Sequence, residues 1–179
     1  KNAVEARAYL ENSSVNAGGD LSLTATSTPT IIAGVGAGSV AIAAGQIGVG
    51  LSGSGVLTEN KIATQIHATI TGDGANGIKA AGVALSATDV SNISAEAGAA
   101  SVAGAFGQAG VALSIGVALS RNDIANDVQA YIFNADTGVF ARGGHLSVNA
   151  EETATIDTIA VAASVGVGVG SDVGIALSG

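Results

Sequence analysis

Few residues in this sequence have the types and the spacing that chemistry requires. Gly48, Gly50 and Gly53 form a G-x-G-x-x-G pattern, and Asp73 follows at the distance of an acidic ribose ligand. A dinucleotide site of this kind needs a strand before the glycines and a helix after them. The next residues, SGVLTEN, carry no helical pattern, and the chain holds 27 glycines, so the match is expected by chance. We assign no cofactor-binding residue.

The histidines and acidic loops do not predict a metal site. His67 and His145 are the only histidines, they sit at different places in the repeat described below, and there is no cysteine to support them. The stretch GDGANG at 72–77 offers oxygen atoms but lacks the repeated aspartates of the nine-residue calcium repeat. We expect no metal ligand and no cofactor, with calcium bound only adventitiously.

The sequence also shows no arrangement of nucleophilic or acidic residues that is typical of a catalytic site. The many serines do not include a G-x-S-x-G nucleophile elbow. Glu151 and Glu152 are adjacent, so on a strand their side chains point to opposite faces and cannot act as a pair. We expect no catalytic residue, and we expect that the chain is not an enzyme.

The charge and the aromatic content of the chain also limit the classes of partner that it could bind. Lysine and arginine total 6 against 14 acidic residues, which gives a net charge of −8, and the basic residues are scattered. Nucleic-acid binding needs a basic footprint with stacking rings, and aromatic residues are only 3% of the chain. We expect no nucleic-acid partner, and the same charge disfavours an anionic membrane surface.

Self-comparison shows a long internal repeat. VNAGGDLSLTAT at 15–26 matches IKAAGVALSAT at 78–88 and FARGGHLSVNAE at 140–151, so Leu21, Val83 and Leu146 correspond. A fixed period of this kind, here about 62 residues, is typical of repeat architectures. The sequence predicts one continuous array with approximate repeats 1–60, 61–122 and 123–179, which we expect to be a window of a longer periodic chain or one that joins its own copies.

The first half of each repeat alternates with a period of two. Leu21, Leu23 and Ala25 alternate with Ser22 and Thr24, and the second and third copies keep this alternation. Such alternation predicts a strand with one buried and one wet face. Equivalent positions should form a packing ladder along the array, Leu21 to Val83 to Leu146.

The second half of each repeat is almost free of charge. Residues 31–51 and 97–119 contain none, so both runs have to be considered as membrane helices. Glycine and β-branched residues alternate instead, and the runs lack flanking aromatic or basic anchors. We expect strands buried on both faces, whose valines fill a layer while the glycines admit a second backbone. The residues concerned in the last repeat are Val165, Gly166, Val167, Gly168, Val169 and Gly170.

These patterns predict an all-β fold, a repetitive β-solenoid (β-helix) stalk of three repeats of about 62 residues. Each repeat would supply about three coils of roughly 20 residues. Stacked long antiparallel β-hairpins are the alternative, with turns at 107–108 and 170–172. No sustained helical period is present.

Two stretches, AYLENSSVNAGGDLSLTATS at 8–27 and GVGLSGSGVLTENKIATQIHATI at 48–70, carry a family resemblance that covers essentially the whole chain. The chain resembles the repeat regions of giant secreted bacterial filamentous adhesins, of the filamentous-haemagglutinin-like and leukotoxin-type families. The second repeat departs from their pattern, because Thr69 stands where Tyr9 and Tyr131 sit in the others. The matching residues are Ala8, Tyr9, Leu10, Glu11, Asn12, Val15, Ala17, Gly18, Gly19, Asp20 and Leu21.

The resemblance implies a structural segment of a secreted, cell-surface or extracellular bacterial filament or adhesin. It implies an elongated, protease-resistant β-rich stalk that self-assembles, with no catalytic residues to carry over. The expected partners are neighbouring copies of the same chain and a host or neighbouring cell surface. A membrane-inserting or pore-forming segment is the alternative function, although a membrane is the less favoured partner.

Overall fold

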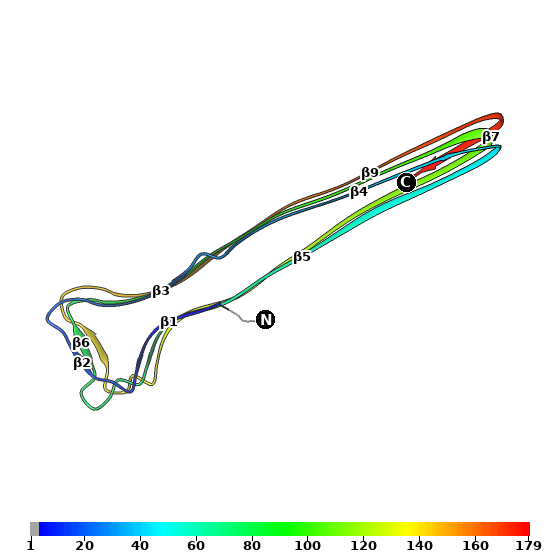
Figure 1. The fold of residues 1–179 in the computed structure, drawn as a ribbon. Coiled ribbons are helices and arrows are strands. Elements are labelled where there is room, and N and C mark those ends of the chain that lie inside the picture. The colour runs from blue at the N-terminus through cyan, green and yellow to red at the C-terminus, as the bar shows by residue number, and fades with distance from the viewer. Residues whose placement is uncertain (1–3) are drawn as a thin grey trace. The chain divides into compact units, whose positions relative to one another are not determined.

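The chain forms an all-β fold in a computed structural model that describes residues 4–179 (Figure 1). The described residues contain strands and no helix. Alternating small and β-branched residues account for this, because they suit a pleated chain and disfavour a helix. The strands are β1 (Val4–Glu11), β2 (Val15–Asn16), β3 (Leu21–Ser27), β4 (Thr30–Ala44), β5 (Ile47–Thr71), β6 (Ile78–Ala80), β7 (Val83–Phe133), β8 (Val139–Ala141) and β9 (Leu146–Ser178).

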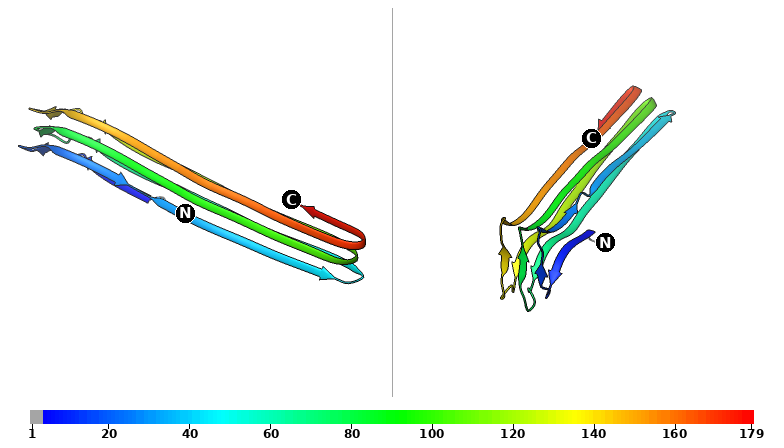
Figure 2. Two further views of the ribbon diagram at one scale, coloured as in Figure 1. Left: turned by 90° about the horizontal axis from the view of Figure 1, so that it is seen from above. Right: turned by 90° about the vertical axis from the view of Figure 1, so that its left-hand side faces the viewer.

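The sheets are mostly parallel and join residues far apart in the sequence. One sheet has the order β1-β5-β7-β3 with β4 and β9 also paired to β7, and the other has the order β2-β6-β8. Val4 pairs with Thr64 and Leu21 pairs with Val83, so paired strands lie about one sequence repeat apart. Figure 2 shows the successive passes of the chain lying side by side. The expected coils of roughly 20 residues are therefore wrong, because a strand's neighbour lies about 62 residues away.

The chain divides into two compact units, and each takes one segment from each sequence repeat. The repeats are therefore not separate globular domains. Unit 1 comprises the described part of Lys1–Thr30 with Lys61–Asn92 and Asp123–Thr155. Unit 2 comprises Ile31–Asn60, Ile93–Asn122 and Ile156–Gly179.

Unit 1 has an aliphatic core between its strands. On β3, Leu23 and Ala25 are buried, while Ser22, Thr24 and Thr26 are exposed. The predicted inward and outward faces of β3 are thus confirmed. Further buried members come from β5, β6 and β7 and are Ile66, Ala68, Ile70, Ile78, Ala80, Val83, Leu85 and Ala87.

We call the part of the chain formed by one sequence repeat a pass. A left-handed residue ends the strand at the same corner of unit 1 in each pass. Asn12, Gly72 and Asn134 have φ angles of 45°, 71° and 53°. The Asn12 N–H donates to the Thr71 carbonyl and the Gly72 N–H donates to the Phe133 carbonyl, both over 2.8 Å, so the three residues are stacked. Glycine and asparagine tolerate this conformation best, which explains why the corner uses only these two types.

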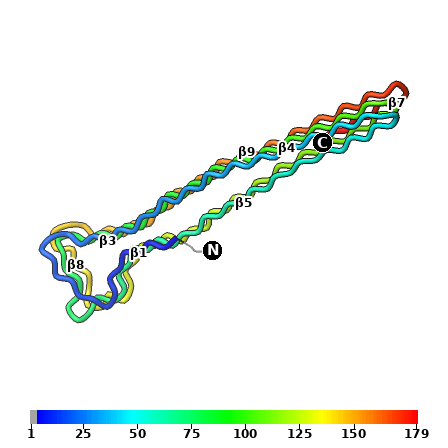
Figure 3. Tube along the Cα trace, viewed as in Figure 1, coloured from blue at the N-terminus to red at the C-terminus, as the bar shows by residue number. Residues whose placement is uncertain are grey.

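Unit 2 consists of passes that double back on themselves. A Cβ placed on Gly48 would lie 3.2 Å from the Ala43 carbonyl oxygen, and one on Gly110 would lie 2.8 Å from that of Ala105. The chain therefore reverses between these residues, near Gly45 and Gly107, and the outgoing and returning strands form two layers. The reversal at 107–108 agrees with the turn expected there, although the strands on either side of it lie in facing layers. The pleat of both layers is visible along the Cα trace in Figure 3.

Candidate assembly surfaces

The glycines of the last pass in unit 2 face the opposite layer at very short range. A Cβ on Gly166 would lie 2.7 Å from the Leu177 carbonyl oxygen, and a Cβ on Gly168 or Gly170 would lie closer still to the backbone of Ile175 or Val173. Real Cβ atoms do not approach backbone atoms so closely, so these positions admit no larger side chain. The glycine face admits a second backbone as the alternation predicts.

The valines of the same stretch are not packed as predicted. Val165, Val167 and Val169 are exposed, with 52%, 43% and 52% of their surface accessible. Within the described chain nothing covers the valine face, so the expected burial on both faces is not met there. The physical reason is that the inward positions of this stretch face the opposite backbone at a range that only glycine fits, so the valines alternate outward.

Leu146 also departs from the prediction. It corresponds to the buried Val83 but remains 53% exposed. The Val83 N–H donates to the His145 carbonyl over 2.9 Å, just as the Leu21 N–H donates to the Gly82 carbonyl over 2.9 Å, so Leu146 holds the expected ladder position. It is exposed because β9 pairs only with β7 and no described residue covers its inward face.

The outer faces of unit 2 are broad and apolar. Unit 2 contains only five charged residues, Glu59, Glu96, Arg121, Asp157 and Asp172. Exposed apolar surface of this extent marks an interaction site on most proteins. We call these residues the outer apolar faces: Ile32, Val40, Ile42, Val102, Phe106, Val161, Val165, Val167 and Val169 on the outgoing strands, and Ile47, Val49, Leu51, Leu57, Ile115, Val117, Leu119, Val173, Ile175 and Leu177 on the returning strands.

Two serine hydroxyl pairs lie inside unit 2, whereas the buried Ser54 hydroxyl has no partner among the described residues. The Ser39 and Ser52 hydroxyls are hydrogen-bonded at 2.7 Å, and those of Ser101 and Ser114 are bonded at the same distance one pass further on. Each pair joins the two layers of one pass. Because both partners are largely removed from water, each bond offsets the cost of burying its hydroxyls.

Ladders of like or complementary side chains run between passes. The Thr58 hydroxyl donates to Ser120 over 2.8 Å, and the Asn60 amide donates to Asn122 over 2.7 Å. In unit 1, Lys61 forms an ion pair with Asp123 at 2.5 Å. In all three pairs the partners occupy equivalent positions of successive repeats, so the side chains follow the register of the backbone.

A buried polar cluster in unit 1 was not anticipated from the sequence. Asp89 is fully buried and accepts hydrogen bonds from the Ser91 hydroxyl at 2.5 Å and the Asn126 amide at 2.7 Å. Asn126 also donates to Ser91, and the second oxygen of Asp89 has no partner. The sequence did carry a signal for it. Asp89 follows the inward-facing Leu85 and Ala87 at intervals of two residues, so its side chain lies on the same face of β7. Asn126 also donates to Glu152 of β9 over 3.2 Å, so it links the buried Asp89 to a neighbouring strand.

Two of the remaining candidate residues, His67 and Asp73, have hydrogen-bond partners within the chain. The His67 imidazole lies 3.2 Å from the Asp127 carboxylate, and His145 is exposed. Asp73, in the loop considered for calcium, accepts the Gly138 N–H over 2.6 Å. Among residues 4–179 no three histidine or acidic side chains are grouped to hold a metal ion. Gly48 and Gly50 lie within β5, so no helix follows their pattern.

Comparison with protein-family models, with curated proteins and with solved structures finds no match for this chain. Within the described residues, no helix is long and apolar enough to cross a membrane.

Proposed function

We propose that the chain is a segment of a repetitive β-solenoid in which one repeat of about 62 residues makes one coil. The observation that carries the proposal is the parallel pairing of Val4 with Thr64, Leu21 with Val83 and Ile78 with Val139. This pairing supports the proposal, because stacked coils of one repeat each would pair strands one repeat apart.

The function proposed for this solenoid is structural. It would serve as part of a secreted, cell-surface or extracellular filament or adhesin, where backbone pairing between coils resists force and proteolysis. The side-chain ladders between successive repeats support this role, because they reinforce contacts between neighbouring coils. Edge strands such as β9 present unpaired backbone groups, to which a further coil of the same kind could add.

Neighbouring copies of the chain are the proposed partners of the outer apolar faces. Packing these faces together would remove exposed valine, isoleucine and leucine side chains from water. The same exposed faces also support a second candidate, a membrane-inserting segment, because they are apolar on both sides of unit 2. Incubation with liposomes separates the candidates, since a filament segment should neither bind the vesicles nor release an enclosed dye.

Electron microscopy of tandem arrays tests the structural role. Arrays with more repeats should lengthen by about 4.8 Å for each added repeat, the spacing between paired strands. Three coils in each repeat would lengthen the array about three times faster and would contradict the proposal. Particles whose length does not grow with repeat number would rule out a solenoid altogether.

A further inference from the structure

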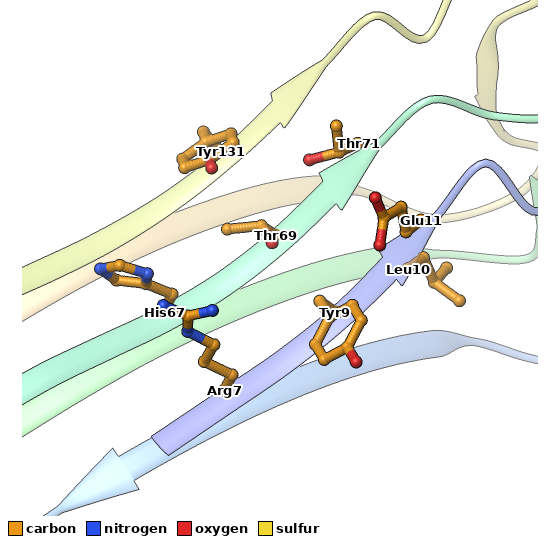
Figure 4. Close-up of a pocket in the computed structure, with 8 residues that line it drawn as sticks. All are labelled: Arg7, Tyr9, Leu10, Glu11, His67, Thr69, Thr71 and Tyr131. Carbon is orange, nitrogen blue, oxygen red and sulfur yellow. The ribbon is translucent and has the colours of Figure 1, made fainter. Parts of the chain in front are cut away.

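A cleft on unit 1 lies over strands β1, β5 and β7, with a volume of about 550 Å³ (Figure 4). Two tyrosines line it, although the chain contains only two tyrosines in total. Thr69 lies between Tyr9 and Tyr131 in the close-up. An aromatic, a small and an aromatic residue therefore follow one another across three neighbouring strands.

The register of the sheet explains this order. Tyr9 pairs with Thr69 across β1 and β5. The hydrogen bond from Gly72 to Phe133 places β7 against β5 one repeat further along the chain, which puts Tyr131 on the other side of Thr69. With about 4.8 Å between neighbouring strands, the two tyrosine backbones are about 10 Å apart. This spacing leaves room for one six-membered ring between the tyrosine rings.

The threonine keeps this space open. Tyr9 and Tyr131 are 62% and 41% exposed, whereas Thr69 is only 9% exposed and forms the floor between them. A tyrosine on the middle strand would fill the space with a third ring. The departure of the second repeat from the Tyr pattern thus creates the slot.

Polar side chains surround the slot on the same strands. Arg7 and His67 line one end of the cleft and Glu11 and Thr71 line the other (Figure 4). Arg7 forms an ion pair with Glu5. His67 lies 3.2 Å from Asp127, which orients its ring. Hydrogen-bond donors and acceptors therefore lie at both ends of an aromatic slot.

We propose that this slot binds a neutral oligosaccharide, with one pyranose ring held between Tyr9 and Tyr131. The apolar faces of a pyranose suit two aromatic rings, and its hydroxyl groups project from the ring edge toward donors and acceptors. An anionic ligand such as a nucleotide would meet the carboxylates of Glu5, Glu11 and Asp127 near a single arginine. A wholly apolar ligand would leave the polar rim unpaired. The site goes beyond the structural role and depends only on the strand pairing of unit 1.

Saturation-transfer NMR on the full chain tests the site, with maltotetraose, cellotetraose and chitotetraose as probes. Saturating the tyrosine ring protons should transfer signal to one of these sugars. Thr69→Tyr should weaken that binding about tenfold or more, because it fills the slot while repeating a residue that the neighbouring strands already carry. Tyr9→Ala should weaken it similarly by removing one wall.

Phe106→Ala is the matched control, because Phe106 is an exposed aromatic residue of unit 2 and should leave sugar binding unchanged. Circular dichroism shows whether each variant keeps its strands. If Tyr9→Ala unfolds, sugar binding by Thr69→Tyr alone tests the slot. Absence of transfer to all three sugars at millimolar concentration would overturn the proposal. So would Thr69→Tyr binding as tightly as the unaltered chain. Neither result depends on how the length of an array grows with repeat number, so the structural proposal is tested independently of the sugar site.

Discussion

Individual glycines in unit 2 differ sharply in what surrounds them. Gly50 faces the other layer, where an added Cβ would lie 2.5 Å from the Gly104 carbonyl oxygen, whereas Gly36 of β4 has open space on its side-chain face. The two residues therefore have the same type and the same strand conformation but opposite constraints. One is required by close approach, and the other is not.

Gly50→Ala should lower the free energy of unfolding by about 1–3 kcal/mol, because the methyl group forces the two layers apart. Gly36→Ala should change it by less than about 0.5 kcal/mol, or raise it slightly, because alanine restricts the unfolded chain. Thermal or denaturant unfolding measures both. Equal effects of the two substitutions would show that the layers do not approach as described.

Asn126→Ala should also destabilise the chain, by about 1–3 kcal/mol, since it removes a donor from the buried Asp89 carboxyl group. Asn149→Ala provides the control, because Asn149 is exposed. Ser27 pairs with Asp89 in the register of β3 and β7. Asp89→Ser combined with Asn126→Thr installs the uncharged residues found one repeat earlier, Ser27 and Thr64, and should recover most of the loss because no buried carboxyl group is left without its donor. If the double variant does not recover stability, the loss in Asn126→Ala does not come from leaving the Asp89 carboxyl group without its donor.

At the scale of elements, the register of paired strands is open to a direct covalent test. Thr24 pairs with Ser86, both are at least partly accessible, and the chain contains no cysteine. Thr24→Cys with Ser86→Cys should oxidise readily to a disulfide, because paired strands place the Cα atoms about 5 Å apart. Thr24→Cys with Thr88→Cys should not, because a shift of two residues separates them by about 8 Å. Mass spectrometry under non-reducing conditions distinguishes the two, and a disulfide in the shifted pair alone would refute the register.

Much of the strand content was predictable, but the arrangement of strands was not. Alternation identified the buried Leu23 and Ala25 and the close-approach glycines, because period two is a local property of a strand. The separation of paired strands along the sequence was missed, since no local pattern states which strand lies beside which. The outward valines were misjudged for a related reason: an uncharged strand is equally apolar whether a partner covers it or not. The corner at Asn12, Gly72 and Asn134 carried a readable signal, because asparagine and glycine alternate there and share a tolerance for positive φ.

For the molecule as a whole, a net charge of −8 opposes association while the outer apolar faces favour it. Sedimentation should therefore show association that increases with protein concentration and with salt, which screens the repulsion. Replacing Val165, Val167 and Val169 together by lysine should abolish it by putting charge on the contact face.

Replacing the exposed Ser22, Thr24 and Thr26 together by lysine changes the net charge by the same amount and gives the control. That control should associate at least as well as the unaltered chain, because it lowers the repulsion without touching the apolar faces. A purely monomeric chain at high salt would remove the basis for lateral assembly.

The thin interior of unit 2 also governs how such a sequence can drift over generations. Inner positions such as Gly50, Gly166 and Ser101 leave room for little beyond hydrogen, methyl or hydroxymethyl groups. Outer positions meet no such limit on side-chain volume, so substitutions there should leave the two layers in place. A lineage carrying this fold would keep a nearly fixed hidden face and a changeable displayed one. The hidden face is thus constrained by packing, whereas the displayed face is constrained only by what it contacts.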